Sequence, residues 1–225
     1  MKTLGNIIKN WIFVLLIVTV NKVSAQELRF GIFANPLVSW MKTDVSSIKG
    51  NGERIGFEAG LIMDKFFAKH YAFTTGISIH NMGGKLIYEK GKTNFKTSDT
   101  MLNLGNNASV KYKLQYIHVP IALKFRTTEI GYITYFAQVG LDPMVNVKAN
   151  ADVQGLTNVN VRKEINPLYI AYHISAGLEY KIVGNTALMA GLTYMNGFSD
   201  VTDNSGYTTE KAVMHCFELR LGVYF

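Results

Sequence analysis

His173 and Ser175 stand two residues apart, and a carboxylate, Glu179, follows four residues after the serine. A histidine and a serine can act as general base and nucleophile, and a carboxylate can orient the imidazole. On an extended strand the His-x-Ser spacing places both side chains on one face, but it also places Glu179 about 13 Å from Ser175, too far for a triad. We therefore predict no catalytic residue and keep hydrolysis as the alternative.

The sequence also predicts no metal ligand and no cofactor. The other histidines have no His or Cys partner two or four residues away; they are His70, His80, His118 and His215. The chain has one cysteine, Cys216, so no intramolecular disulfide can form. We expect Cys216 to be a small buried residue.

These polar residues lie in segments that alternate apolar and polar side chains with a period of two, the pattern of a β-strand. In the last segment Phe217, Leu219, Leu221, Val223 and Phe225 alternate with Cys216, Glu218, Arg220, Gly222 and Tyr224. Eight such segments are predicted, at about 27–41, 53–65, 70–82, 112–126, 131–146, 167–181, 186–197 and 213–225. The connections after the second, fourth and sixth are short and the others are long. This alternation of short and long connections, with both chain termini on the side of the short turns, is typical of an outer-membrane barrel.

The hydropathy of the chain agrees with a barrel. Only 17% of the residues are charged and the mean hydropathy is +0.10, yet the longest apolar run after residue 25 is Leu168 to Tyr172. A membrane helix needs about 20 apolar residues. In lipid only helices and closed barrels give every backbone N–H and C=O group a hydrogen-bond partner. We predict an all-β fold, an eight-stranded antiparallel up-and-down transmembrane barrel formed by residues 26–225. The alternative is an exported soluble sandwich or lipocalin-like barrel.

Residues 1–25 are predicted to be a cleaved signal peptide. Lys2 and Lys9 precede an apolar core, residues 11–20, and small side chains end the segment at residues 23–25. Removal of this segment, which also contains Lys22, lowers the formal net charge from +7 to +4. This mild excess does not indicate a nucleic-acid partner. We expect export through the secretory pathway to the outer membrane of a Gram-negative cell.

The lumen-facing positions of the predicted strands carry charges of both signs. They are Arg29, Glu58, Asp64, His80, Lys124, Asp142, His173, Glu179, Lys181, Glu218 and Arg220. Because an unpaired buried charge is costly, we expect these groups to pair across a polar, plugged lumen rather than to line a pore. Pro120 lies in mid-strand and predicts a bulge or a local distortion. Phe217, Tyr224 and Phe225 are expected to join an aromatic girdle.

The longest connection, residues 83–111, contains five lysines and two acidic residues. We expect a solvated surface loop. Contact with the phosphates of lipopolysaccharide is the functional alternative.

The segment 116–125 reads YIHVPIALKF. It resembles the tyrosine–aliphatic–x–aliphatic–proline–x–x–leucine–lysine segment of PorT-like outer-membrane barrels of Bacteroidetes. The similarity extends through residues 129–132, Gly140, 177–180, 184–186 and 191–198. His118 stands where the family often has an acidic residue, so a role of that carboxylate does not carry over, and the roles of His118 and Lys124 stay open.

The resemblance implies an eight-stranded barrel in which Pro120 is a family feature. It also implies a link to type IX protein secretion, in which the namesake of the family acts. We therefore expect a non-enzymatic outer-membrane barrel that acts through loop or periplasmic contacts. The expected partners are outer-membrane lipid, lipopolysaccharide and secretion-system proteins. The alternative function is that of a lipid A hydrolase.

Overall fold

A computed structural model describes residues 27–98, 100–203 and 211–225. The predicted signal peptide, residues 1–25, lies outside the described residues. No helix among the described residues is long and apolar enough to cross a membrane.

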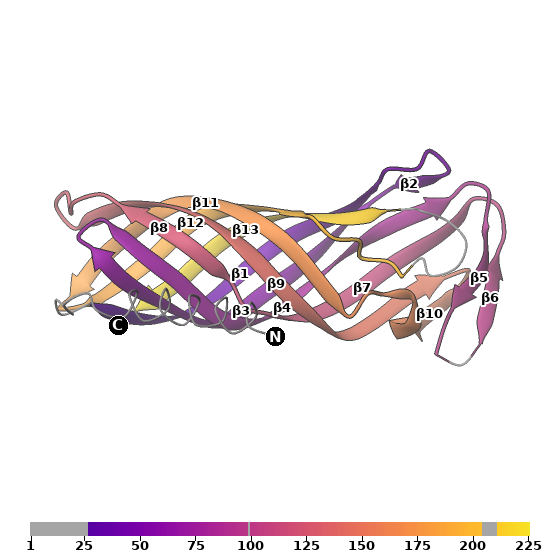
Figure 1. The fold of residues 1–225 in the computed structure, drawn as a ribbon, viewed down its shortest axis with the longest axis horizontal. Coiled ribbons are helices and arrows are strands. Elements are labelled where there is room, and N and C mark those ends of the chain that lie inside the picture. The colour runs from indigo at the N-terminus through magenta and orange to yellow at the C-terminus, as the bar shows by residue number, and fades with distance from the viewer. Residues whose placement is uncertain (1–26, 99, 204–210) are drawn as a thin grey trace, which may run out of the picture.

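The strands form a closed antiparallel ring with eight members (Figure 1). In ring order they are β1 (Leu28–Thr43), β3 (Glu53–Ala68), β4 (Tyr71–Tyr88), β7 (Ala108–His118) continued by β8 (Ile121–Arg126), β9 (Ile133–Val153), β11 (Leu168–Val183), β12 (Thr186–Gly197) and β13 (Ala212–Tyr224). The first and last strands close the ring, with Gly31 opposite Tyr224 and Met41 opposite Met214. The predicted barrel is confirmed, and several strands extend further toward the long connections than the sequence indicated.

Pro120 interrupts the fourth member of the ring, where the sequence predicted a bulge or a distortion. β7 ends at His118 and β8 begins at Ile121. The register on the neighbouring strand β4 is unchanged across the break, because Ser78 faces His118 and Thr75 faces Ile121. The missing donor of the proline therefore interrupts the hydrogen-bond ladder without a bulge.

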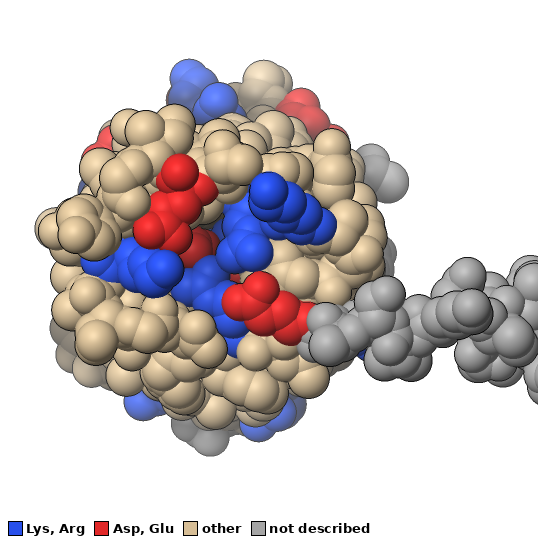
Figure 2. Space-filling model, turned by 90° about the vertical axis from the view of Figure 1, so that its left-hand side faces the viewer, with Lys and Arg blue, Asp and Glu red and all other residues tan. Residues whose placement is uncertain are grey.

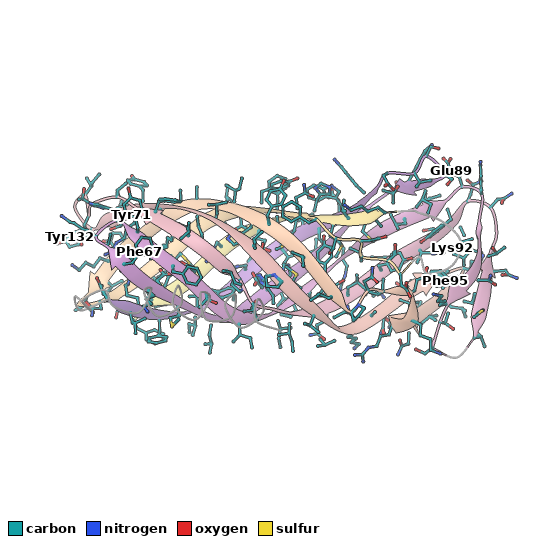
Figure 3. All side chains as sticks on the ribbon, viewed as in Figure 1. Phe67, Tyr71, Glu89, Lys92, Phe95 and Tyr132 are labelled. Carbon is teal, nitrogen blue, oxygen red and sulfur yellow. The ribbon has the colours of Figure 1, made fainter. Side chains whose placement is uncertain are left out.

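The outer surface of the barrel is an apolar belt between two rings of aromatic side chains. Near the short turns lie Phe67, Tyr71, Phe125, Tyr132 and Tyr180, of which Figure 3 labels three. Toward the long connections lie Trp40, Tyr172, Tyr194, Phe198 and Phe217. Between them the outward side chains, such as Ile32, Leu221 and Val139, are exposed. This surface matches a hydrocarbon layer with aromatic residues at both interfaces.

The prediction for the C-terminal aromatic residues is partly wrong. Tyr224 is fully buried in the lumen, because it has the opposite strand parity to Phe225, which is exposed at the short-turn end. Phe217 lies in the aromatic ring at the opposite end, where its ring centroid is 5.6 Å from that of Trp40.

Beyond the second aromatic ring the strands continue into a folded extension. It adds β2 (Ile48–Gly50), β5 (Lys92–Lys96), β6 (Met101–Leu104), β10 (Leu156–Asn160) and the 3₁₀ helix η1 (Arg162–Glu164). The hairpin of β5 and β6 buries Phe95 and Leu104 in a core shared with Tyr88 and Val161. The expectation of a solvated loop is therefore wrong for these residues, because their apolar side chains among the lysines pack together.

The polarity of the two strand faces is inverted in the extension. There Lys85, Lys111 and Asp152 face outward, whereas Leu86 and Val110 are buried. In the belt the outside is apolar and the lumen polar, because the surroundings are hydrocarbon; in the extension the outside meets water and the inside becomes an apolar core. The prediction of a polar lumen is thus wrong for the half next to the long connections, where Met41, Met82, Leu114, Met144 and Met214 fill the interior.

We expect Leu221→Arg to lower the free energy of unfolding by about 2–4 kcal/mol, because a charge on the lipid face must be moved into hydrocarbon. The matched control is Leu156→Arg, since Leu156 in the extension is similarly exposed (52% against 41% for Leu221). The measurement is denaturant unfolding in lipid vesicles, followed by the fluorescence of Trp40. Equal losses of stability in the two variants would contradict the assigned position of the apolar belt.

Candidate functional site

Lys124 is the centre of an ion cluster in the lumen near the short turns. Its ammonium group donates to Asp64 Oδ2 at 2.7 Å, to Glu179 Oε1 and to the Tyr224 hydroxyl at 3.0 Å. Arg29 Nη1 donates to Glu179 Oε2 at 2.7 Å. Two basic and two acidic groups from four strands therefore neutralise one another, and with Tyr224 from a fifth strand the cluster links opposite walls of the barrel.

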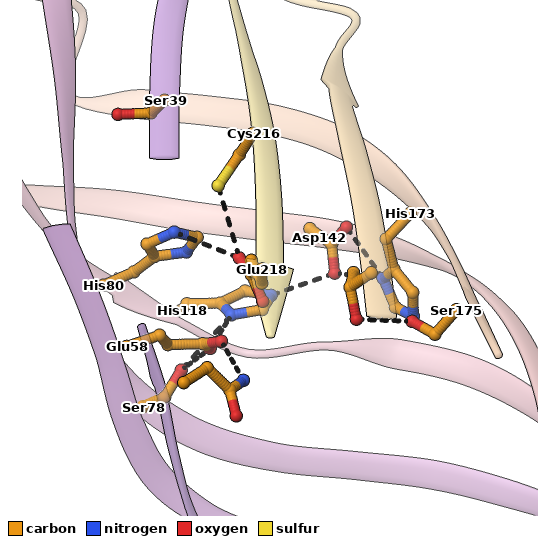
Figure 4. A network of polar contacts seen from close by, with 12 residues as sticks. Ser39, Glu58, Ser78, His80, His118, Asp142, His173, Ser175, Cys216 and Glu218 are labelled. Carbon is orange, nitrogen blue, oxygen red and sulfur yellow. Dashed lines mark hydrogen bonds and ion pairs between the residues drawn. The ribbon is translucent and has the colours of Figure 1, made fainter. Parts of the chain in front are cut away.

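His118 is the centre of a second network, in the middle of the barrel (Figure 4). Its Nδ1 lies 2.7 Å from Glu58 Oε1 and its Nε2 lies 2.9 Å from Asp142 Oδ1. Two carboxylate acceptors require a hydrogen on both ring nitrogens, so this geometry favours the imidazolium ion. Asp142 also accepts from His173 Nδ1 at 2.8 Å, and Ser78 donates to Glu58. His118 thus bridges two acidic residues by its positive charge.

The candidate catalytic residues do not form a catalytic arrangement. His173 contacts Asp142 through Nδ1 and Gln138 through Nε2, while Ser175 shares a hydrogen bond of 2.8 Å with Thr193. Among the described residues no hydrogen bond joins His173 to Ser175. Glu179 belongs to the Lys124 cluster. The geometry therefore does not support a hydrolase built on these three residues.

The lumen leaves little free space between these groups. A cavity of about 30 Å³ touches Glu58, His118, Asp142, His173 and Glu218. This volume holds one or two water molecules. In an eight-stranded barrel the side chains are expected to fill the interior, and the part of the chain that the structure describes agrees with a plugged lumen.

The short-turn end of the barrel has a charged depression of about 190 Å³. Figure 2 shows acidic and basic side chains gathered at the centre of this end, surrounded by residues of other types. The charged residues that line it are Glu27, Arg29, Arg126, Glu129, Glu179 and Lys181. Lys181 and Glu129 form an exposed pair at 3.3 Å.

Of the eleven predicted lumen charges, all but Lys181 are buried. Lys181 is exposed because it lies at the strand end, where the barrel opens to solvent. Several neutral partners of these charges were not predicted, namely Asn35, Thr74, Ser78 and Gln138. Tyr224, which was expected in the aromatic girdle, is a further partner in the lumen. The strand alternation was the available signal, since each of these residues occupies a lumen-facing position.

We expect Lys124→Met to lower the free energy of unfolding by about 3–5 kcal/mol, because it leaves Asp64 and Glu179 buried without their cation. The control is Lys181→Met, which removes the same charge from an exposed pair and should cost about 0–1 kcal/mol. Denaturant midpoints of the folded barrels in detergent measure both. If the Lys124→Met protein were as stable as the Lys181→Met protein, the ion cluster would not contribute to the stability of the barrel.

Solved structures of small outer-membrane barrels are similar to this fold. The outer membrane protein OprG from Pseudomonas aeruginosa is 10% identical, with a TM-score of 0.50, over 89% of this chain and 97% of that chain. Neisserial surface protein A is 16% identical, with a TM-score of 0.49, over 87% and 95% of the two chains. At such identities the likeness concerns the fold alone. A search of curated protein sequences returned no match.

A family model for the outer membrane protein beta-barrel domain matches residues 24–203. The match includes the first seven members of the ring, and the geometry adds the closing pair of β13 with β1. The belt, the girdles and the closed ring agree with a location in the outer membrane. This chain belongs to the outer membrane protein beta-barrel domain family.

Proposed function

We propose that this protein is a non-enzymatic, PorT-like barrel that acts by contact at the cell surface, and that its outer wall above the belt binds phosphate groups of lipopolysaccharide. The observation that carries the proposal is a pair of lysines, Lys85 on β4 and Lys111 on β7, which face each other directly across neighbouring strands. Like charges in this position repel and destabilise a sheet. An anion between them would remove the repulsion.

The surroundings of the lysine pair suit a phosphate group. The pair lies beyond the second aromatic ring, on the outward side of the strands, where the phosphates of the outer leaflet come close to the protein. It lines a depression of about 500 Å³ together with Ser109 and Glu53. A serine hydroxyl and two ammonium groups are donors that phosphate oxygens accept.

One acidic residue that lines the same depression, Asp152, already forms an ion pair with Lys113. Lys113 Nζ lies 2.7 Å from its Oδ2. The hydrogen bond from Lys113, with backbone N–H donation from Asn158, holds the pKa of Asp152 below its usual value. Asp152 faces Lys111 as well as binding Lys113, but the three lysines Lys85, Lys111 and Lys113 outnumber it, so a net positive charge remains for an anion.

The test is the double variant Lys85→Gln, Lys111→Gln. Near a membrane surface each lysine contributes about 1 kcal/mol toward an anionic lipid, so we expect roughly thirty-fold weaker binding of lipid A in detergent. The control, Lys65→Gln with Lys69→Gln, removes the same charge from the short-turn end. Native mass spectrometry measures how much phosphorylated and dephosphorylated lipid A each protein retains. Equal retention of the two lipids by the unmodified protein would contradict the proposal.

A second candidate is an accessory role in type IX secretion. It rests on the resemblance of residues 116–125 to PorT-like barrels and on three charges at the short-turn end, the half-buried Arg126 and the exposed Glu129 and Lys181. This end faces the periplasm in the proposed orientation. Deletion of the gene should then reduce secreted cargo, and Lys181→Glu should reduce it in part. Unchanged secretion after deletion would rule this role out.

A further inference from the structure

His80 on β4 is a buried histidine whose ring has no hydrogen-bond partner in the described part of the chain. Its side chain is fully buried, and neither ring nitrogen makes a hydrogen bond among the described residues. The nearest carboxylate atom recorded is Glu218 Oε1, 3.4 Å from Nε2. A buried polar group without a partner costs about 1–3 kcal/mol. A ligand bound to the His80 ring would remove this cost.

Cys216 and Glu218 face His80 from the other side of the lumen. Their alternate positions on β13 direct both side chains inward, and Cys216 Sγ lies 3.7 Å from Glu218 Oε1. Figure 4 shows the cysteine and the histidine directed toward the same carboxylate. One ligand atom of each of the three residues lies within 4.8 Å of the others. All three side chains are buried.

We propose that His80, Cys216 and Glu218 bind a divalent metal ion of the zinc class inside the barrel. Thiolate sulfur, imidazole nitrogen and carboxylate oxygen are the ligands that such an ion prefers. On binding, the Cys216 thiol gives its proton to water and its sulfur bonds to the metal. One thiolate, one carboxylate and a neutral imidazole then balance the two positive charges, so the site is neutral within a poorly solvated interior.

A second set of residues, Glu58, His80 and His118, has similar spacing, but it is a poorer site. Both nitrogens of His118 already contact carboxylates, Glu58 at 2.7 Å and Asp142 at 2.9 Å. In the chosen set the imidazole of His80 makes no hydrogen bond to any residue that the structure describes. The cavity of about 30 Å³ is lined by Glu218 but not by His80 or Cys216, so a water molecule that supplies a fourth ligand would approach from the Glu218 side.

The site joins β4 to β13, which are not neighbours in the ring. A metal ion here would link two walls of the barrel directly above the His118 network. It does not depend on the proposed contact with lipopolysaccharide, whose lysines lie on the outer wall of the extension.

The test is refolding of the mature chain into detergent with Co²⁺ as the probe. We expect one ion per chain, a thiolate-to-cobalt charge-transfer band in the near ultraviolet, and loss of that band when Zn²⁺ is added. Including the ion during refolding removes any barrier to entry. A folded barrel that binds no Co²⁺, or binds it without a thiolate band, would overturn the proposal.

Two variants and one control identify the ligands. Cys216→Ser should abolish the charge-transfer band. Loss of a residue that only hydrogen-bonds a metal ligand weakens metal binding roughly 10–100-fold, and His80→Gln should weaken Co²⁺ binding by more than that. The control His70→Gln removes a histidine near the short turns and should leave the spectrum unchanged. Heat-modifiable gel migration confirms folding of each variant. If Cys216→Ser keeps the band, or if His70→Gln removes it, the assigned ligands are wrong.

Discussion

Closure of the ring by β1 and β13 is the constraint on which the rest of the structure depends. In hydrocarbon a backbone N–H or C=O without a partner costs several kcal/mol, so a sheet in the membrane cannot have an open edge. The pairing from Gly31–Tyr224 to Thr43–Ala212 removes that edge. The break at Pro120 is tolerated because the register on both sides is the same, so the neighbouring strands stay paired.

Closure also creates an interior that water scarcely enters, and this determines how its charges are arranged. Arg29, Lys124, Asp64 and Glu179 balance one another in one layer, and His118 bridges Glu58 and Asp142 in the next. Such pairs need near-complete neutralisation, since their desolvation is costly. In the same interior, His80 stands out because its nitrogens lack hydrogen bonds among the described residues.

The polarity of the extension changes because its strands lie beyond the hydrocarbon layer. Above the second aromatic ring the strands keep their pairing but exchange the polarity of their faces, so that the barrel becomes a water-exposed sheet around an apolar core. The core holds the β5–β6 hairpin and the lysine-bearing strands in fixed positions. A rigid surface is better suited to binding than a mobile loop, because less conformational entropy is lost on contact.

The sequence alone determined the fold class, the eight members of the ring and nearly all lumen charges, because strand alternation is a local property that each segment carries independently. It also indicated a distortion at Pro120. Tertiary structure alone decided which charges meet: Lys124 joins Asp64 and Glu179, and His80 approaches Cys216 and Glu218, all from strands far apart in the chain. Register and ring closure set these distances, and neither can be read from the period of a single strand. For the same reason, Ser175 pairs with Thr193 rather than with His173.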